Sequence, residues 1–213
     1  MLSWLFHIIF IILFIFIYLH ICVHFRISIE NEFISLEDIC RKEITNHIYL
    51  KQPFYFDGKS IKHSIVLNES LKTSNKGYDK FTLTYESIPL LEPTVKFFPT
   101  SSAYSFRKAN KHAEVETNLE CRNFYYVHKG KAKITCIHPK YSEHFLQKET
   151  NIDFIKTNTN MIHVELDESK VLFIPNYWYV FIESLEKDTL IEKIQYSTIL
   201  NKVNFIYDKY IHG

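Results

Sequence analysis

The chain has 213 residues, of which 46% are hydrophobic and 16% aromatic, so it has enough apolar side chains for the core of one domain of ordinary size. The formal net charge at pH 7 is only +1, and no basic run alternates with stacking aromatic residues. This balance excludes nucleic acid as an expected partner. The composition therefore predicts one domain with an appended segment.

Residues 1–25, MLSWLFHIIFIILFIFIYLHICVHF, precede the first charged side chain, which is Arg26. As a helix at about 1.5 Å per residue they would extend roughly 37 Å, which exceeds the hydrocarbon core of about 30 Å. The segment is apolar on every face, whereas a core helix carries an apolar stripe. A cleaved signal peptide, the alternative interpretation, would begin with positive charge and end in small residues, and the segment does neither. We predict a retained, single-pass transmembrane anchor that binds membrane lipid.

The side of the membrane on which the rest of the chain lies stays open. Cys22 lies in the span, and the odd number of cysteines that remains, Cys40, Cys121 and Cys136, favours reduced thiols facing the cytosol. The sequon at residues 68–70 points to the opposite side. The sequence predicts a membrane location without fixing the topology.

Residues 26–50 are predicted to form a connector that contains one short helix. In SLEDICRKEI, residues 35–44, Ser35 has the character of an N-cap residue and is followed by acidic residues. The apolar residues then recur on one helical face, as expected for a helix that packs against a domain. These residues are Leu36, Ile39, Cys40 and Ile44.

From residue 51 to residue 213, short runs of β-branched or aromatic residues alternate with turn residues, and no long amphipathic helix interrupts them. Many short strands in one compact unit predict an all-β sandwich or barrel. Two consecutive runs are predicted to pair as an antiparallel hairpin through Gly130, whose backbone would supply a positive φ. The predicted strands are 52–57, 63–68, 81–88, 123–129, 131–138, 162–166, 170–175, 178–183 and 190–199.

Three segments resemble parts of the JmjC-like and cupin-like hydroxylases, a jelly-roll (double-stranded β-helix) family. CRNFYYVHKGKAKITCIHP at 121–139 resembles the first half of the family's barrel, VLFIPNYW at 171–178 the second, and KQPFYFD at 51–57 its opening strand. The resemblance covers residues 50–200 and implies a cupin-like jelly roll with a few short helices, preceded by the transmembrane helix. The scaffold residues that it carries over are Asn123, Gly130, Pro139, Pro175 and Trp178.

The same resemblance locates the positions at which family enzymes hold Fe(II), with a His-x-Asp pair and a distant His. The aligned residues here are Thr117, Leu119 and Val180, none of which is a useful iron ligand. In a related branch a Lys pairs with the co-substrate carboxylate, and its equivalent here is Ala132. The resemblance therefore implies a degenerate member with no catalytic residues, no metal and no cofactor.

The residues themselves leave alternatives to the metal-free interpretation and to the interpretation of the aromatic side chains as core. A divergent Fe(II)/2-oxoglutarate oxygenase could recruit His112 and Glu114, a His-x-Glu pair that precedes the aligned positions. His128 and His138 could also serve a metal, although hydrogen bonding is the main interpretation. An aromatic group is interpreted as core packing, with a ligand pocket as the alternative. It consists of Tyr125, Tyr126, Tyr177, Trp178 and Tyr179.

The chain as a whole is similar to small membrane-anchored cupin-like proteins encoded by large DNA viruses. The similarity rests on the anchor, on LEDIC and QPFYFD, and on FIPNYWYVFIE, where that group reads IPxYWWYSI with the ligand His already replaced. This copy departs from the pattern at Tyr179 and Val180. The resemblance implies a non-catalytic binding or structural module in a viral or host membrane, with a protein as a further partner.

Overall fold

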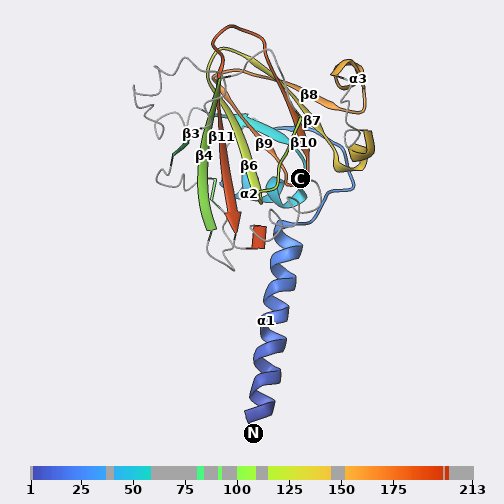
Figure 1. Ribbon diagram of the computed structural model, residues 1–213, viewed down its shortest axis with the longest axis vertical. Coiled ribbons are helices and arrows are strands. Elements are labelled where there is room, and N and C mark those ends of the chain that lie inside the picture. The colour runs from blue at the N-terminus through green and yellow to red at the C-terminus, as the bar shows by residue number, and fades with distance from the viewer. Residues whose placement is uncertain are drawn as a thin grey trace.

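The computed structural model describes residues 2–36, 41–58, 81–83, 91–92, 100–108, 115–144, 152–198 and 200–201. A long helix, α1 (Leu2–His24), projects from one end of a domain built from two β-sheets (Figure 1). The other described helical segments are short: α2 (Arg41–Leu50), the 3-10 segment η2 (Pro139–His144) and α3 (Ile152–Thr157). The described chain is thus mostly β-sheet with few helices and one apolar helix at its start.

Helix α1 is long and apolar enough to cross a membrane. Its side chains from Trp4 to Leu19 are exposed, apart from the half-buried Ile17, and only its last turns contact the β domain. The helix predicted for residues 1–25 is confirmed over Leu2–His24.

The described strands form two sheets. The larger has the order β1-β2-β9-β6-β11-β4-β3 and the smaller has the order β5-β10-β7-β8. Only the β1–β2 pair is parallel among the described pairs. The strands are β1 (Ile34–Ser35), β2 (Phe54–Asp57), β3 (Phe81–Leu83), β4 (Thr100–Lys108), β5 (Val115–Thr117), β6 (Arg122–Lys129), β7 (Ala132–Ile137), β8 (Ile162–Leu166), β9 (Lys170–Ile174), β10 (Tyr179–Ser184) and β11 (Leu190–Thr198).

The strands from β4 to β11 pair in a nested order. β4 pairs with β11, β5 with β10, β6 with β9, and β7 with β8, all antiparallel. β4 to β7 therefore pair in reverse order with β8 to β11, as the two arms of one long hairpin would. Successive strands along the chain mostly belong to different sheets. In addition, β11 pairs with β6 and β10 pairs with β7, and these pairings connect the strand pairs into the two sheets.

The start of the predicted connector helix is wrong. Ser35 lies in β1 and pairs with Tyr55, while the backbone N–H of Leu36 donates to the carbonyl of Tyr55 at 3.0 Å. These sheet contacts take the backbone groups that a helix starting at Ser35 would need. The described helix is α2, whose Ile44 and Ile48 are buried on the larger sheet. Residues 37–40, including Ile39 and Cys40, lie outside the described residues.

The predicted hairpin through Gly130 is also wrong, although the predicted positive φ is confirmed at 81°. β6 belongs to the larger sheet, between β9 and β11, and β7 belongs to the smaller sheet, between β8 and β10. Six consecutive residues of β6 are buried, so both of its faces are covered, and its two edges pair with β9 and β11 rather than with β7. Gly130 is therefore the point at which the chain crosses between sheets.

The other predicted strands agree with β2 and with β6 to β11 to within a few residues. The longest described strands include β4, which was not predicted, because its sequence TSSAYSFRK is rich in small polar residues. The predicted strand at 63–68 lies outside the described residues, and of the strand at 81–88 the structure describes Phe81–Leu83 as β3.

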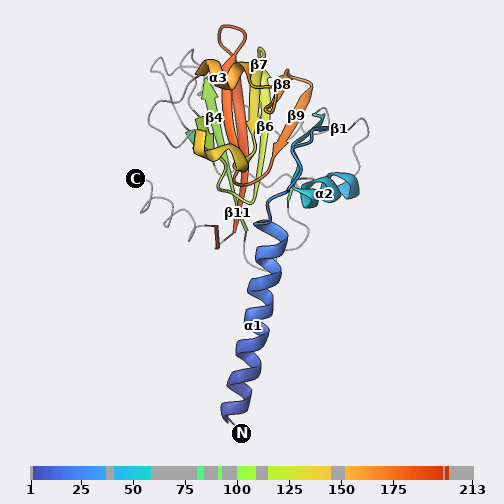
Figure 2. The same ribbon diagram turned by 90° about the vertical axis from the view of Figure 1, so that its right-hand side faces the viewer.

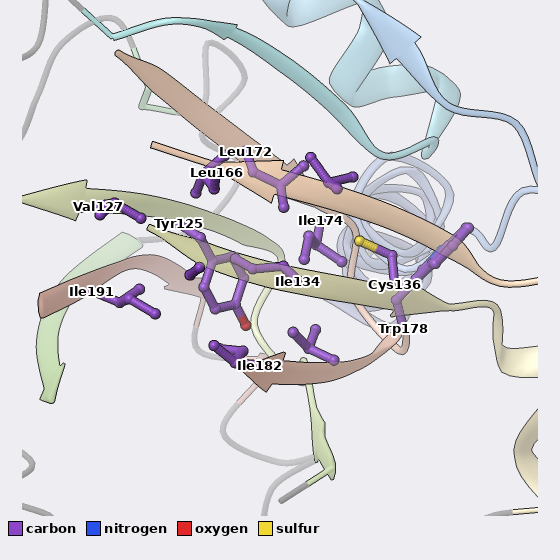
Figure 3. Packing of buried hydrophobic residues seen from close by; sticks show 13 residues of the cluster. Tyr125, Val127, Ile134, Cys136, Leu166, Leu172, Ile174, Trp178, Ile182 and Ile191 are labelled. Carbon is purple, nitrogen blue, oxygen red and sulfur yellow. The ribbon is translucent and has the colours of Figure 1, made fainter. Parts of the chain in front are cut away.

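Side chains alternate between three apolar layers. The interior layer between the sheets includes Tyr125, Val127 and Trp178 (Figure 3). Phe124 and Tyr126 point to the opposite face of the larger sheet, which α2 covers. The outer face of the smaller sheet packs against α3 through Ile155. The residues predicted as a connector thus supply one strand and one covering helix to the β domain.

Candidate functional site

The three positions that the resemblance aligns with iron ligands do not lie on one face. Val180 is fully buried in the interior layer and pairs with Glu116 of β5. Thr117 pairs with Tyr179 and is exposed, while Leu119 is half-buried beyond the end of the strand. Residues directly opposite each other in an antiparallel pair project to the same face. Glu116, rather than Thr117, therefore shares the interior face with Val180.

Asn118 joins Glu116 on the inside of the domain. It is fully buried, and its side-chain Oδ1 accepts a hydrogen bond of 2.7 Å from the hydroxyl of Tyr125. Its backbone fixes the turn before β10: its N–H donates to the carbonyl of Trp178 at 3.0 Å, and its carbonyl accepts from the N–H of Tyr177 at 2.5 Å. We call Glu116, Asn118, Tyr125, Trp178 and Val180 the interior site.

The electrostatics of the interior site keep Tyr125 as a hydrogen-bond donor. Burial raises the pKa of its phenol well above the ordinary value, and the carboxylates of Glu116 and Glu120 raise it further. The ammonium of Lys193, on β11, lies 5.6 Å from the centroid of the Tyr125 ring, within the range of a cation–π contact. The hydroxyl therefore stays protonated and donates to Asn118.

Two further donors in this region are buried. Asn118 Nδ2 and Trp178 Nε1 have no hydrogen-bond partner among the residues that the structure describes. The Trp178 ring packs edge-on against His138, with the ring centroids 4.9 Å apart. Unpartnered buried donors are costly in a packed core.

The position expected for a co-substrate cation holds a methyl group. Ala132 is fully buried in the interior layer and pairs with Leu166 and Ser184. Lys133, one residue on, pairs with Glu165 and Glu183 on the outer face of the smaller sheet. Strand alternation thus keeps this lysine away from the interior site.

The other residues weighed as metal ligands have separate protein partners. His128 Nε2 lies 2.7 Å from Glu192 Oε2. His138 Nε2 lies 2.8 Å from the carbonyl of Ser28, and its Nδ1 accepts from the N–H of Lys140 at 3.1 Å. Both histidines are hydrogen-bonded, as predicted. No three His, Cys, Asp or Glu residues within the described ranges gather to hold a metal ion, and His112 and Glu114 lie outside those ranges.

The aromatic group separates into different layers. Tyr125 and Trp178 are in the interior layer, whereas Tyr126 lies on the opposite face of the larger sheet and donates to the carbonyl of Glu168 at 3.2 Å. Tyr179 packs on the outer face of the smaller sheet. Tyr177 is half-buried in the β9–β10 turn, with a positive φ of 67°. These rings do not line one pocket.

The remaining scaffold residues lie near the ends of strands or in the segments that follow them. Asn123 is fully buried on β6 and its Nδ2 donates to the carbonyl of Glu120 at 3.1 Å. Pro175 follows β9 and Pro139 begins η2. These residues shape the segments around the interior site without contributing chemistry to it.

Sequence reasoning missed a buried polar cluster where α1 meets the β domain. Lys51 is almost fully buried, and its Nζ donates to the carbonyl of His24 at 3.0 Å and to Asn176 Oδ1 at 3.4 Å. The ammonium group therefore satisfies a carbonyl at the end of α1, where a positive charge is also favoured by the helix dipole. No local pattern around Lys51 signals this contact, because its partners come from distant parts of the chain.

Two neighbours of Lys51 complete the cluster. The thiol of Cys121 donates to the carbonyl of Tyr196 at 2.8 Å, and burial raises its pKa to about 11, so the thiol stays protonated. Arg122 Nη1 donates to the carbonyl of Leu91 at 3.0 Å. Burial lowers the pKa of Lys51 to about 8, and the nearby Arg122 cation also lowers it.

The Lys51 pKa predicts a pH dependence of stability. Between the folded value of about 8 and the ordinary value of 10.5, the unfolded chain binds more protons than the folded chain. The contribution of Lys51 to the free energy of unfolding should therefore rise with pH across this window, by up to about 3 kcal/mol, whereas the raised pKa of Cys121 acts in the opposite direction between pH 9 and 11. In Lys51→Met this rise should be absent. Denaturant unfolding of both proteins in detergent between pH 8 and 10 measures the difference, and equal slopes would contradict the buried ammonium.

Comparisons with known proteins give little overlap. No protein-family model matches the sequence, and no curated protein matches it. Among solved structures, the crystal structure of Co(II) HppE in complex with Tris buffer is similar with a TM-score of 0.30 and 8% identity, over 45% of this chain and 45% of that chain. The crystal structure of Fe(II) HppE gives a TM-score of 0.30 and 8% identity, over 45% of this chain and 43% of that chain. This chain thus spans less than half the length of both. The resemblance to viral proteins stays a prediction.

Proposed function

We propose that this chain is a membrane-anchored, cupin-like jelly-roll module that acts by binding rather than by catalysis. The jelly-roll assignment is supported by the nested pairing of β4 with β11, β5 with β10, β6 with β9 and β7 with β8. A folded ribbon of this kind, wound so that its strands are shared between two sheets, is the way in which an eight-stranded jelly roll is built.

The non-catalytic part of the proposal rests on one observation, the packing of the interior site. Family enzymes use this end of the barrel for an iron triad with open coordination positions. Here the position of the distant ligand is Val180, fully buried in the interior layer, and the amide of Asn118 is hydrogen-bonded to Tyr125. The interior site therefore offers one carboxylate, that of Glu116, and no imidazole, which is fewer ligands than an iron triad requires.

Membrane anchoring is supported by the exposed apolar surface of α1. From Trp4 to Leu19 the helix presents large apolar side chains to its surroundings in every direction, which in water would be strongly unfavourable. A lipid bilayer is the solvent that fits such a surface. The β domain would then be presented at the membrane surface, where a protein or a small polar molecule is the partner class.

The test of the non-catalytic proposal is metal loading of the full-length protein. The protein, purified in detergent, is incubated anaerobically with Fe(II), desalted and analysed for iron, and the turnover of 2-oxoglutarate is then followed. We expect far less than one equivalent of iron and no turnover above a buffer control. One equivalent of iron together with turnover would overturn the proposal and make His112 and Glu114 the first residues to substitute.

A further inference from the structure

Among the described residues, the contacts of the β domain with the last turns of α1 lie along one side of the helix. His20 and His24 are buried and Ile17 is half-buried, a spacing that places the three on one helical face. His20 Nε2 lies 3.0 Å from the hydroxyl of Thr198, the last residue of β11, and the carbonyl of His24 accepts from Lys51. The end of the β domain therefore reaches down the helix to the level of His20, about 6 Å before His24.

The flanks of the same turns are apolar and exposed. Leu19 is 41% exposed and Ile21 is 48% exposed, although both lie next to His20 along the chain. Side chains of this kind are stable in hydrocarbon rather than in water. With α1 spanning the bilayer as proposed above, the exposed Leu19 and Ile21 are best accommodated in hydrocarbon, which puts Thr198 and the end of β11 close to the hydrocarbon boundary.

Exposed apolar side chains also follow α1 along the chain and precede Lys51, the residue that contacts its end; Ile29, two residues beyond Ile27, is 93% exposed as well. Ile27 is 43% exposed and follows the helix by three residues. Tyr49 and Leu50, 52% and 45% exposed, end α2 directly before Lys51, the residue bonded to His24. Figures 1 and 2 show α2 beside the upper end of α1 in both views. We call Ile27, Tyr49 and Leu50 the lipid-facing rim.

We propose that the lipid-facing rim lies in the interfacial layer of the bilayer, among the glycerol and upper acyl segments of phospholipids, and presses the β domain against the membrane. The inference rests on the proposed anchoring by α1, with which the rim is continuous. A tyrosine suits this layer because its ring is apolar and its hydroxyl meets water. Apolar area rather than charge supplies the attraction, so neutral phosphatidylcholine is the lipid partner to test.

The experiment measures the depth of single tryptophans in the full-length protein, reconstituted into phosphatidylcholine vesicles. Trp4→Phe removes the native tryptophan in the span and leaves the buried Trp178 as a constant background. Tyr49→Trp reports the rim, and Phe10→Trp reports the centre of α1. Leu185→Trp is the matched control, because Leu185 is 48% exposed but lies in the β10–β11 loop, at the end of the domain farthest from α1 (Figures 1 and 2).

Lipids brominated near the glycerol end of the acyl chain should quench Tyr49→Trp at least about twofold more than Leu185→Trp. Adding Leu50→Glu to Tyr49→Trp should reduce that quenching, while adding Leu185→Glu should not. If lipids brominated deep in the chain quench Phe10→Trp but the rim reporter behaves like the Leu185 control, the rim inference is overturned and the anchor stands. If Phe10→Trp is not quenched either, the anchoring itself is overturned together with the rim. Equal quenching in vesicles that contain phosphatidylserine would support an apolar rather than an ionic contact.

Discussion

Gly130→Val is expected to lower the free energy of unfolding by about 3 kcal/mol or more, because it combines backbone strain with a collision. The backbone of Gly130 has a φ of 81°, in the left-handed region that side chains with a Cβ branch avoid. A Cβ atom there would lie 2.7 Å from Thr189 Oγ1 and 3.2 Å from Thr189 Cα. Thr189 is held in place, since it is fully buried and its hydroxyl donates to the carbonyl of Lys131 at 3.1 Å.

Thermal or denaturant unfolding in detergent measures this loss, and Gly130→Ala is compared with Gly58→Ala as the matched pair, because each adds one methyl group. A Cβ atom at Gly58 would meet Val171 Cγ2 at 3.0 Å and Tyr126 Cε2 at 3.2 Å, but it would carry no left-handed backbone strain, because the φ of Gly58 lies outside that region. We therefore expect a clearly smaller loss for Gly58→Ala. Equal losses at the two glycines would show that the crossing between sheets at Gly130 is not the strained point.

The second large effect is the gain of an iron site by a triple substitution on the interior face. Glu116→His, Asn118→Asp and Val180→His together should bind about one equivalent of Fe(II), because Glu116 pairs directly with Val180 and Asn118 already lies inside the domain. The hydroxyl of Tyr125, which donates to Asn118 at 2.7 Å, would then donate to the new carboxylate and orient it.

The control moves two of the three substitutions by one residue. The control variant introduces the same three ligands, two imidazoles and one carboxylate, as Thr117→His, Leu119→Asp and Val180→His. Thr117, however, is exposed and pairs with Tyr179 on the outer face. We expect the affinity for Fe(II) of the control to be lower by about 100-fold, as for a site whose ligands are misplaced. Iron titration of the two folded variants measures the ratio. Tighter binding by the control would show that β5 is shifted by one residue against β10.

The apolar helix, most of the strands and the positive φ of Gly130 follow from the sequence, because each depends on local properties. A run such as residues 1–25 needs no partner to be helical in a bilayer, and period-2 or fully apolar runs indicate strands wherever the partner lies. The exceptions among the described strands are β1, β4 and β5, which were not predicted. The small polar residues of β4 carry no local strand signal, and β4 forms because β11 pairs along its whole length.

Only the tertiary structure shows to which face of its strand each residue of the interior site projects. The sequence resemblance placed the ligand positions at Thr117 and Leu119, one residue away from the pair that lies inside, Glu116 and Asn118. In a strand an error of one residue exchanges the two faces, and only the register against β10 removes the ambiguity.

Sheet membership and the contact between α1 and the β domain were likewise decided by distant residues. The sequence favours a hairpin at Gly130 because turn signals are local, yet β6 and β7 each have two other strand partners that cover their edges. Lys51 is hydrogen-bonded to Asn176, and His20 lies within hydrogen-bond distance of Thr198, which is 178 residues away along the chain. The burial of both side chains therefore depends on distant residues. The sequence by itself determined the apolar length of the anchor and the strand-forming segments, since both are local properties. The tertiary structure decided which faces meet, because burial of a polar group depends on partners that no local pattern encodes.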